Sequence, residues 1–382
     1  MPPRKLRICL LANAASVHTQ RWAAYFAERG HEMHVLSLEY HEIEGATVHT
    51  LRWWPKATKL GYFSALPQVR RLLCQLKPDI LHGHYVISYG LLAWLSRVRP
   101  LVLTVWGSDL LVSPGRSPLV WFALKRAFQG ADLITCLADH LAQLVRKLGI
   151  NPSRVRTMPF GVRTDLFSLP PPGSPRDIDL ICTRNFETVY NVDLLIRALA
   201  IISAKFRRIR VVFAGTGQLK STLEQLGRNL GVSELIEWVG WRSSAEIADL
   251  LKRSKVFVSP AVSDGTSTAL TEAMSCGTFP VVTDIPANRP WIQHGVNGFL
   301  TPTDAPQELA DRVITALSEE SLRDVAAAQN AATVRDRADW FAMMLHMEEE
   351  YLRLATTTPA APLGSRPAPS ANLEKGQDRV HT

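Results

Sequence analysis

Two carboxylates, Asp264 and Glu272, stand eight residues apart in segment 256–284. The segment predicts a buried strand, a turn that contains Asp264, a helix that contains Glu272, and a second buried strand. The helix begins with small hydroxyl residues, Ser267 and Thr268, where free backbone N–H groups and the positive end of the helix dipole bind a phosphate well. On this interpretation the loop carboxylate of Asp264 approaches a sugar, and the helix carboxylate of Glu272 meets a ribose. Alternatively, Asp264 only begins the turn and Glu272 is a solvated helix residue.

Further polar residues follow other strands predicted in the second half of the chain. Arg184 stands at the carboxyl end of one strand, where its planar guanidinium can clamp a diphosphate. The alternative is a surface arginine paired with Glu187. Asn191 opens the next helix and is a further candidate for ligand binding. Gly215 and Gly217 end another strand, where glycine lets the backbone approach a ligand closely.

Polar and aromatic residues also follow strands in the first half. Ser16 and His18 begin a helix after the first strand, His84 ends a later strand, and Trp106 and Asp109 follow the next one. They are candidates for the side of a cleft that binds an acceptor. His18 is otherwise a surface residue of its helix, and His84 otherwise a polar residue at a strand end. No third ligand accompanies the histidines of that strand, so no metal site is predicted.

Residues 264–277 resemble the signature of the family 4 glycosyltransferases, Glu-x7-Glu followed by Ala-Met-x-x-Gly. The sequence here is Asp264-x7-Glu272, then Ala273-Met274 and Gly277. The resemblance covers about residues 5–350. It implies the GT-B fold, in which two Rossmann-like lobes face a cleft and the last helix crosses back to the first lobe.

Three positions depart from the family pattern. The first glutamate of the signature is Asp264, which keeps the charge but reaches one methylene less far. The lysine that follows the diphosphate-binding arginine by five or six residues is absent, since Val189-Tyr190-Asn191 stand there. Trp106 replaces a histidine that contacts the transferred sugar, which makes Asp109 the remaining polar candidate.

The resemblance implies a retaining hexosyltransferase that moves a sugar from a nucleotide-diphosphate donor to an acceptor hydroxyl in polysaccharide, glycolipid or related glycoconjugate synthesis. Its implied catalytic residues are Arg184, Asp264, Glu272 and Asp109. The implied donor-binding residues are Gly215, Gly217, Ser267, Thr268 and Asn191, and the implied acceptor-side residues are Ser16, His18, His84 and Trp106. No cofactor or metal is expected, because nothing resembles an Asp-x-Asp site.

Two other functions stay open at this point. A nucleotide-sugar epimerase uses the same two-lobed fold, but it needs acid and base groups around the sugar C2 that cannot be assigned here. A catalytically degenerate transferase would keep donor binding without turnover, and the three departures from the family pattern favour that alternative.

Charge indicates the partners. The formal net charge is +8, and most of the excess of Lys and Arg lies in the first 160 residues. Such a charge favours anionic partners, namely nucleotide phosphates and an anionic membrane surface. A saccharide or lipid-linked acceptor fits that surface, because Lys56, Lys59, Arg70 and Arg71 flank the aromatic residues Trp53, Trp54, Tyr62 and Phe63. A solvated charged face over core aromatics is the alternative. Nothing indicates nucleic acid.

Cysteine usage and hydropathy indicate the compartment. The five cysteines are scattered through apolar runs and form no Cys-x-x-Cys, which predicts buried, reduced thiols and a cytoplasmic protein, with peripheral contact to the inner face of the membrane. The apolar run near the N-terminus is short and leads into a helix, so it predicts a first strand rather than a signal peptide. No run reaches the length of a membrane span.

The order of elements predicts the domains. Apolar runs alternate with helical patterns in both halves, which favours parallel sheets built from βαβ units. A Pro-rich linker, 169–175, separates the halves. The strands are predicted at 6–12, 33–38, 80–84, 101–105, 133–136, 155–158, 178–183, 211–214, 236–239, 256–258 and 280–283. The predicted parts are an acceptor-side lobe (1–165), a donor lobe (166–335), a crossing helix (336–354) and a disordered tail (355–382).

Overall fold

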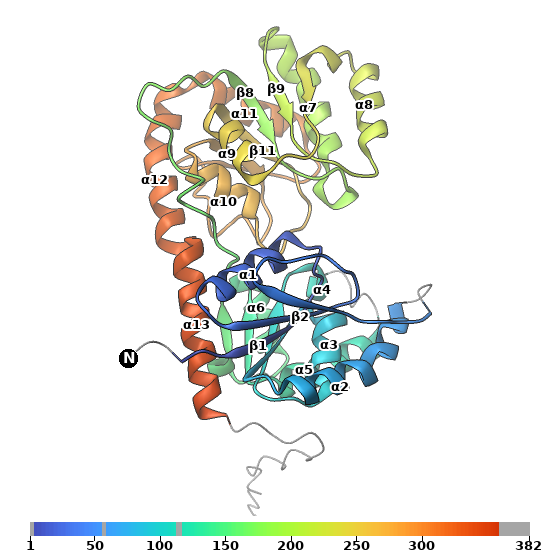
Figure 1. The fold of residues 1–382 in the computed structure, drawn as a ribbon. Helices are drawn as coiled ribbons and strands as arrows, with labels where there is room; N and C mark the ends of the chain where they lie inside the picture. Colours follow the sequence, from blue (N-terminus) through green and yellow to red (C-terminus); the bar gives the residue numbers. More distant parts are fainter. Residues whose placement is uncertain (1–3, 56–58, 112–116, 359–382) are drawn as a thin grey trace, which may run out of the picture.

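The computed structural model describes residues 4–55, 59–111 and 117–358, and these form two α/β lobes with a long helical segment along one side (Figure 1). The first lobe holds a parallel sheet in the order β3-β2-β1-β4-β5-β6-β7. Its strands are β1 (Arg7–Leu11), β2 (Glu32–Ser37), β3 (Ala46–Thr50), β4 (Ile80–His84), β5 (Leu101–Val105), β6 (Leu133–Cys136) and β7 (Val155–Thr157). Its helices are α1 (Val17–Glu28), α2 (Leu66–Leu76), α3 (Leu91–Ser96), α4 (Ser108–Leu111), α5 (Pro118–Gly130) and α6 (Asp139–Lys147).

The second lobe repeats this architecture around a smaller sheet. Its strand order is β10-β9-β8-β11-β12-β13, and all pairs are parallel. The strands are β8 (Ile178–Cys182), β9 (Val211–Phe213), β10 (Ile236–Trp238), β11 (Ser254–Ser259), β12 (Phe279–Thr283) and β13 (Phe299–Thr301). The helices are α7 (Val192–Lys205), α8 (Lys220–Asn229), α9 (Ser244–Lys252), α10 (Thr268–Ser275), α11 (Pro306–Ser318) and α12 (Glu320–Ala338), followed by α13 (Trp340–Thr357).

The central strands form where the sequence has short apolar runs. β4, β5, β6 and β12 are buried along their whole length, as expected of parallel strands covered by helices on both faces. Two strands were missed. β3 is a half-exposed edge strand that contains Thr and His, and β13 has only three residues. Neither gives a clear apolar run.

A break at Asp339 separates α12 from α13 and lets the chain return to the first lobe. The Asp339 carboxylate accepts a hydrogen bond from the Ala342 N–H at 2.9 Å and so caps α13. Met344, Met347 and Tyr351 of α13 are buried in the core of the first lobe. The crossing helix predicted from the sequence is thus confirmed (Figure 1), although it begins at Trp340 and continues to Thr357, beyond the predicted end. The tail was predicted at 355–382. Its residues 355–357 belong to α13 instead, and the part from residue 359 onward lies outside the described residues. In the part of the chain that is described, no helix combines the length and hydropathy needed to cross a bilayer.

Buried hydrogen bonds fix α13 on the sheet. The Tyr351 hydroxyl accepts a hydrogen bond from Trp22 Nε1 at 3.2 Å and lies 2.5 Å from His82 Nδ1. His82 Nε2 lies 2.5 Å from the Thr104 hydroxyl. Burial lowers the pKa of His82 well below its usual value, so the ring is neutral and one nitrogen accepts while the other donates. The network joins α1, β4, β5 and α13.

We expect Tyr351→Phe to destabilise the protein by about 1–3 kcal/mol, because it leaves Trp22 Nε1 and His82 Nδ1 unpaired in the core. Urea denaturation followed by circular dichroism measures the free energy of unfolding. The matched control is Tyr40→Phe, at a side chain that is 66% exposed, for which we expect a change within about 0.5 kcal/mol. Equal unfolding midpoints for the two variants would contradict the structural role of this network.

Candidate active site in the interlobe cleft

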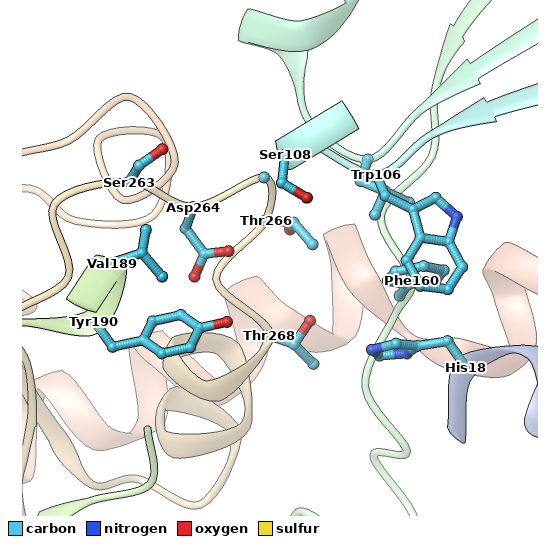
Figure 2. Close-up of a pocket in the computed structure, with 12 residues that line it drawn as sticks. His18, Trp106, Ser108, Phe160, Val189, Tyr190, Ser263, Asp264, Thr266 and Thr268 are labelled. Atoms are coloured by element: carbon cyan, nitrogen blue, oxygen red, sulfur yellow. The ribbon is translucent and has the colours of Figure 1, made fainter. Parts of the chain in front are cut away.

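A cavity of about 280 Å³ lies between the lobes and takes its walls from both. Figure 2 shows side chains of the two lobes facing one another across it. The first lobe contributes His18, Trp106, Ser108, Leu137 and Phe160. The second lobe contributes Val189, Tyr190, Ser263, Asp264, Gly265, Thr266 and Thr268. A cleft at the carboxyl ends of two parallel sheets is the usual ligand site of such folds.

The strand order explains how Arg184 and Asp264 meet. The order of the second sheet reverses between β8 and β11, which are neighbours, and a ligand crevice opens outside the strand ends at such a reversal. Arg184 follows β8 and Asp264 follows β11, so their side chains form an ion pair with 2.8 Å between Nη2 and Oδ2. The guanidinium carbon of Arg184 also lies 4.0 Å from the centre of the Tyr190 ring.

The ion pair leaves donor capacity free. Arg184 is only 7% exposed, and its buried Nε has no hydrogen-bond partner among the described residues. A buried N–H without a partner is costly, so this arrangement favours a bound anion. Asp264 accepts this hydrogen bond through Oδ2, and its Oδ1 has no hydrogen-bond partner among the described residues.

Glycine lets the two lobes touch beside this pair. A Cβ on Gly265 would come within 2.0 Å of the Trp106 carbonyl oxygen, and one on Gly107 within 2.3 Å of the Gly265 Cα. Gly107 also has a φ of +126°, which disfavours any other residue. Backbone therefore meets backbone at the edge of the cleft.

The N-terminus of α10 opens into the cavity. Within the described part of the chain, no side chain caps this helix at Ser267. The Thr268 N–H donates to the Thr266 carbonyl at 3.0 Å, which leaves the amides that follow it in the first turn available to an anion. Thr268 lines the cavity, and Glu272 lies one turn further along the same face. Burial raises the pKa of Glu272 to about 7, and the charges of Arg21 and Arg184 counteract that rise. The Glu272 carbonyl accepts the Cys276 N–H at 3.1 Å, but its carboxylate makes no hydrogen bond to any described residue.

Neutral rings form the opposite wall. His18 stacks on Phe160 with 4.1 Å between ring centres and meets Trp106 edge-on at 5.6 Å. His84 is buried between Trp22 and Trp106, and neither of its ring nitrogens has a partner among the described residues. Burial lowers the pKa of His18 to about 4 and that of His84 to about 3. Both rings are uncharged at neutral pH.

Asp109 is a correction to the sequence prediction. Its side chain is buried and does not face the cavity. The carboxylate accepts backbone N–H bonds from Val86 at 2.9 Å, Trp106 at 3.1 Å and Gly107 at 2.8 Å. Burial raises the pKa of Asp109, and these hydrogen bonds oppose that rise. The residue holds the loop that carries Trp106 rather than contacting a sugar.

Eight other predicted site residues lie beside the cavity rather than in its lining, namely Arg184, Glu272, Ser267, His84, Asn191, Gly215, Gly217 and Ser16. Asn191 has a φ of 52° and donates a hydrogen bond to the Thr303 carbonyl at 2.8 Å, so it shapes the start of α7. A Cβ on Gly215 would come within 2.4 Å of the Arg184 carbonyl oxygen. Gly217 similarly approaches Phe186, and Ser16 precedes α1. These two glycines pack one loop against another.

Arg21 was not singled out from the sequence. It lies one turn after His18 on α1, and its guanidinium sits 4.3 Å from the centre of the Trp340 ring. Its charge is the largest one acting on Glu272. The available signal was the i, i+3 spacing from His18, which places Arg21 and His18 on one face of α1. The spacing does not show that this face meets α10.

The described residues contain no group of three His, Cys, Asp or Glu side chains placed to hold a metal ion. The positive groups of the cleft are arginines and the N-terminus of a helix. Those groups are able to bind a phosphate by themselves.

Comparisons with known proteins identify the family of the chain. The family model described as "Glycosyl transferase 4-like" matches residues 7–138, and that of "Glycosyl transferases group 1" matches residues 171–333. These ranges fall one in each lobe and together cover most of the chain. The protein therefore belongs to the glycosyl transferases group 1 family and is a glycosyltransferase of the GT-B fold.

Individual relatives are distant. The chain is 25% identical to the phosphatidyl-myo-inositol mannosyltransferase of Mycobacterium leprae, over 89% of this chain and 93% of that protein. It is 23% identical to the phosphatidylinositol N-acetylglucosaminyltransferase gpi3 subunit of Schizosaccharomyces pombe, over 71% of this chain and 60% of that protein. Crystal structures of HepE from Anabaena with UDP have the same fold, with a TM-score of 0.76 at 17% identity, over 91% of this chain and 100% of that one.

We predict that Glu272 makes stability depend on pH. The pKa of its carboxyl is raised from 4.5 to about 7 in the folded protein, so the folded state binds the proton more tightly than the unfolded state. The stability this proton contributes is present below pH 4.5 and is lost as the pH rises to about 7. Between pH 5 and pH 8, the wild type should lose on the order of 1–3 kcal/mol relative to Glu272→Gln. Urea denaturation at both pH values measures this difference.

The control for this prediction is Glu349→Gln, at an exposed carboxylate of α13. It should follow the wild type at both pH values. A wild type and a Glu272→Gln variant with the same pH dependence would show that Glu272 is ionised normally in the cleft.

Proposed function

We propose that the protein transfers a hexosyl group from a nucleoside diphosphate sugar to an acceptor hydroxyl, with retention of configuration at the anomeric carbon. The observation that carries this assignment is the Arg184–Asp264 pair beside the uncapped N-terminus of α10, in a cleft with walls from both lobes. A guanidinium with an unpaired N–H group, close to free amides of a helix N-terminus, suits a diphosphate.

In this reaction the bond between sugar C1 and the phosphate oxygen breaks, and its electron pair stays on the diphosphate. The acceptor oxygen bonds to C1 from the same face, and its proton passes to the departing phosphate oxygen. Negative charge grows on the diphosphate, where Arg184 and the amides near Ser267 and Thr268 stabilise it. The second oxygen of Asp264 orients a sugar hydroxyl, and ionised Glu272 accepts hydrogen bonds from the ribose.

A uridine nucleotide is the first donor to test, because HepE has been crystallised with UDP and with UDP-glucose. A saccharide or a lipid-linked acceptor is proposed. Mannosyl transfer to phosphatidyl-myo-inositol is named for one relative, and the first lobe exposes Arg70, Arg71 and 78% of Trp54, which supports contact with an anionic membrane surface. Lys56 lies outside the described residues, as does the side chain of Lys59.

Turnover is predicted to depend on the Arg184–Asp264 pair and on Glu272. Purified protein is incubated with UDP-, GDP- and ADP-sugars and a membrane lipid extract, and release of the nucleoside diphosphate is measured. One donor should give release that depends on the extract. Arg184→Ala and Glu272→Ala should each lower kcat/KM by roughly 100- to 1,000-fold. The first removes a buried cation that stabilises the leaving diphosphate, and the second removes the hydrogen-bond acceptor that holds the ribose. The product's anomeric configuration, read by NMR, reports retention.

Arg210→Ala is the matched control, since Arg210 stands before β9, at the opposite end of the same sheet, and pairs with Asp177 and Glu237. It should keep full turnover. Donor binding that depends on Arg184 and Glu272 but gives no turnover with any acceptor would instead indicate a degenerate donor-binding protein.

Turnover is also predicted to need no divalent metal, because arginine and helix amides supply the positive charge at the diphosphate. Rates with excess EDTA should equal those with added Mg²⁺ or Mn²⁺. A loss of turnover in EDTA that either ion restores would contradict this part of the proposed function.

A further inference from the structure

Two helices from different lobes face each other across the cleft. Figure 2 shows His18 of α1 and Thr268 of α10 on opposite sides of the cavity. Residues three or four positions apart share one face of a helix. Arg21 follows His18 on α1 and Glu272 follows Thr268 on α10, so these two charged residues form a second pair of facing positions behind the first.

The environment of Arg21 leaves part of its guanidinium unused. Its guanidinium carbon lies 4.3 Å from the centre of the Trp340 ring, a cation–π contact that holds the group beside α13. Its Nη2 is buried and has no hydrogen-bond partner among the described residues. No ion pair involves Arg21 in the described part of the chain, although Glu272 is the largest charge acting on it. A buried guanidinium N–H without a partner is a site for an anion.

The charges of the donor wall show why a second cation is needed. Arg184 is already balanced by Asp264 at 2.8 Å, and Glu272, whose pKa burial raises to about 7, adds a negative charge once it ionises. His18 is neutral, because burial lowers its pKa to about 4. Where the family has a lysine, Val189 and Tyr190 line the cavity. Without Arg21, the wall would be net negative toward a diphosphate that becomes more negative during the reaction.

We infer that Arg21 supplies the second positive charge for the leaving diphosphate of the donor, from the lobe opposite Arg184. This assignment rests on the proposed transfer from a nucleoside diphosphate sugar. Because Arg21 belongs to the first lobe, its charge reaches the diphosphate only when the lobes are apposed around the donor. Donor binding and apposition of the lobes are thereby coupled.

The test compares UDP with UMP. UMP lacks the β-phosphate, whose oxygen carries the sugar in the donor. Affinities of the full-length protein for both nucleotides are measured by isothermal titration calorimetry for wild type, Arg21→Lys and Arg21→Gln. Arg21→Gln should weaken UDP binding by about 10- to 100-fold and UMP binding much less. Arg21→Lys should recover part of the UDP affinity, since it restores the charge without the fork. The salt dependence of UDP binding should also fall in Arg21→Gln.

Arg163→Gln is the matched control. Arg163 acts on Arg21 electrostatically but already pairs with Asp165 at 2.5 Å, so its removal should leave the ratio of UDP to UMP affinity unchanged. Thermal unfolding of all variants separates a loss of fold from a loss of binding.

Two results would overturn the assignment. Equal UDP affinity in wild type and Arg21→Gln would show that Arg21 does not contact the diphosphate. Equal losses for UDP and UMP would show that Arg21 only shapes the wall through Trp340 and Glu272. Both results presuppose that the wild type binds UDP. A wild type that binds none of UDP, GDP and ADP would instead overturn the proposed function, and this inference with it.

Discussion

The placement of the lobes depends on a short piece of backbone pairing at the hinge. The Val162 N–H donates to the Ala338 carbonyl at 2.7 Å, and the Trp340 N–H donates to the Val162 carbonyl at 2.8 Å. This pairing sets where α12 stops and where α13 begins, and Gly161, with a φ of +76°, permits the close approach. Because Trp340 then lies against Arg21, the same contact that turns the chain back to the first lobe also holds a cation near Glu272.

Parallel sheets account for most of the site's geometry. Side chains that follow neighbouring strands emerge at one edge of a sheet, so Arg184 and Asp264 meet although 80 positions separate them. This was predictable, because the apolar runs of the inner strands are clear in the sequence and the signature around Asp264 and Glu272 is specific. The edge strand β3 and the short β13 were not predictable, since neither carries enough apolar residues to stand out.

The errors concern side chains whose direction depends on the local fold. A polar residue shortly after a strand can face the cleft or turn back onto its own loop, and sequence does not distinguish these outcomes. Asp109 turns back because three backbone N–H groups converge on it, and Asn191 does so because the left-handed start of α7 directs its amide toward Thr303. Arg21 was missed because the residues it contacts or acts on, Trp340 and Glu272, belong to other helices. Helical spacing alone does not identify them.

The cleft concentrates features that work against the stability of the unliganded protein. Glu272 sits where burial raises its pKa to about 7, and polar atoms of Arg21, His84, Trp106 and Arg184 are buried without partners among the described residues. In a core, such groups would be replaced by apolar ones, because each costs free energy when left unpaired. Each adjoins the cleft, through Glu272, Trp106 or Asp264, which is explained if a ligand that carries hydroxyls and phosphates satisfies them. The same interactions that stabilise a bound nucleotide sugar would then hold the lobes together, so donor binding and assembly of the site are one event.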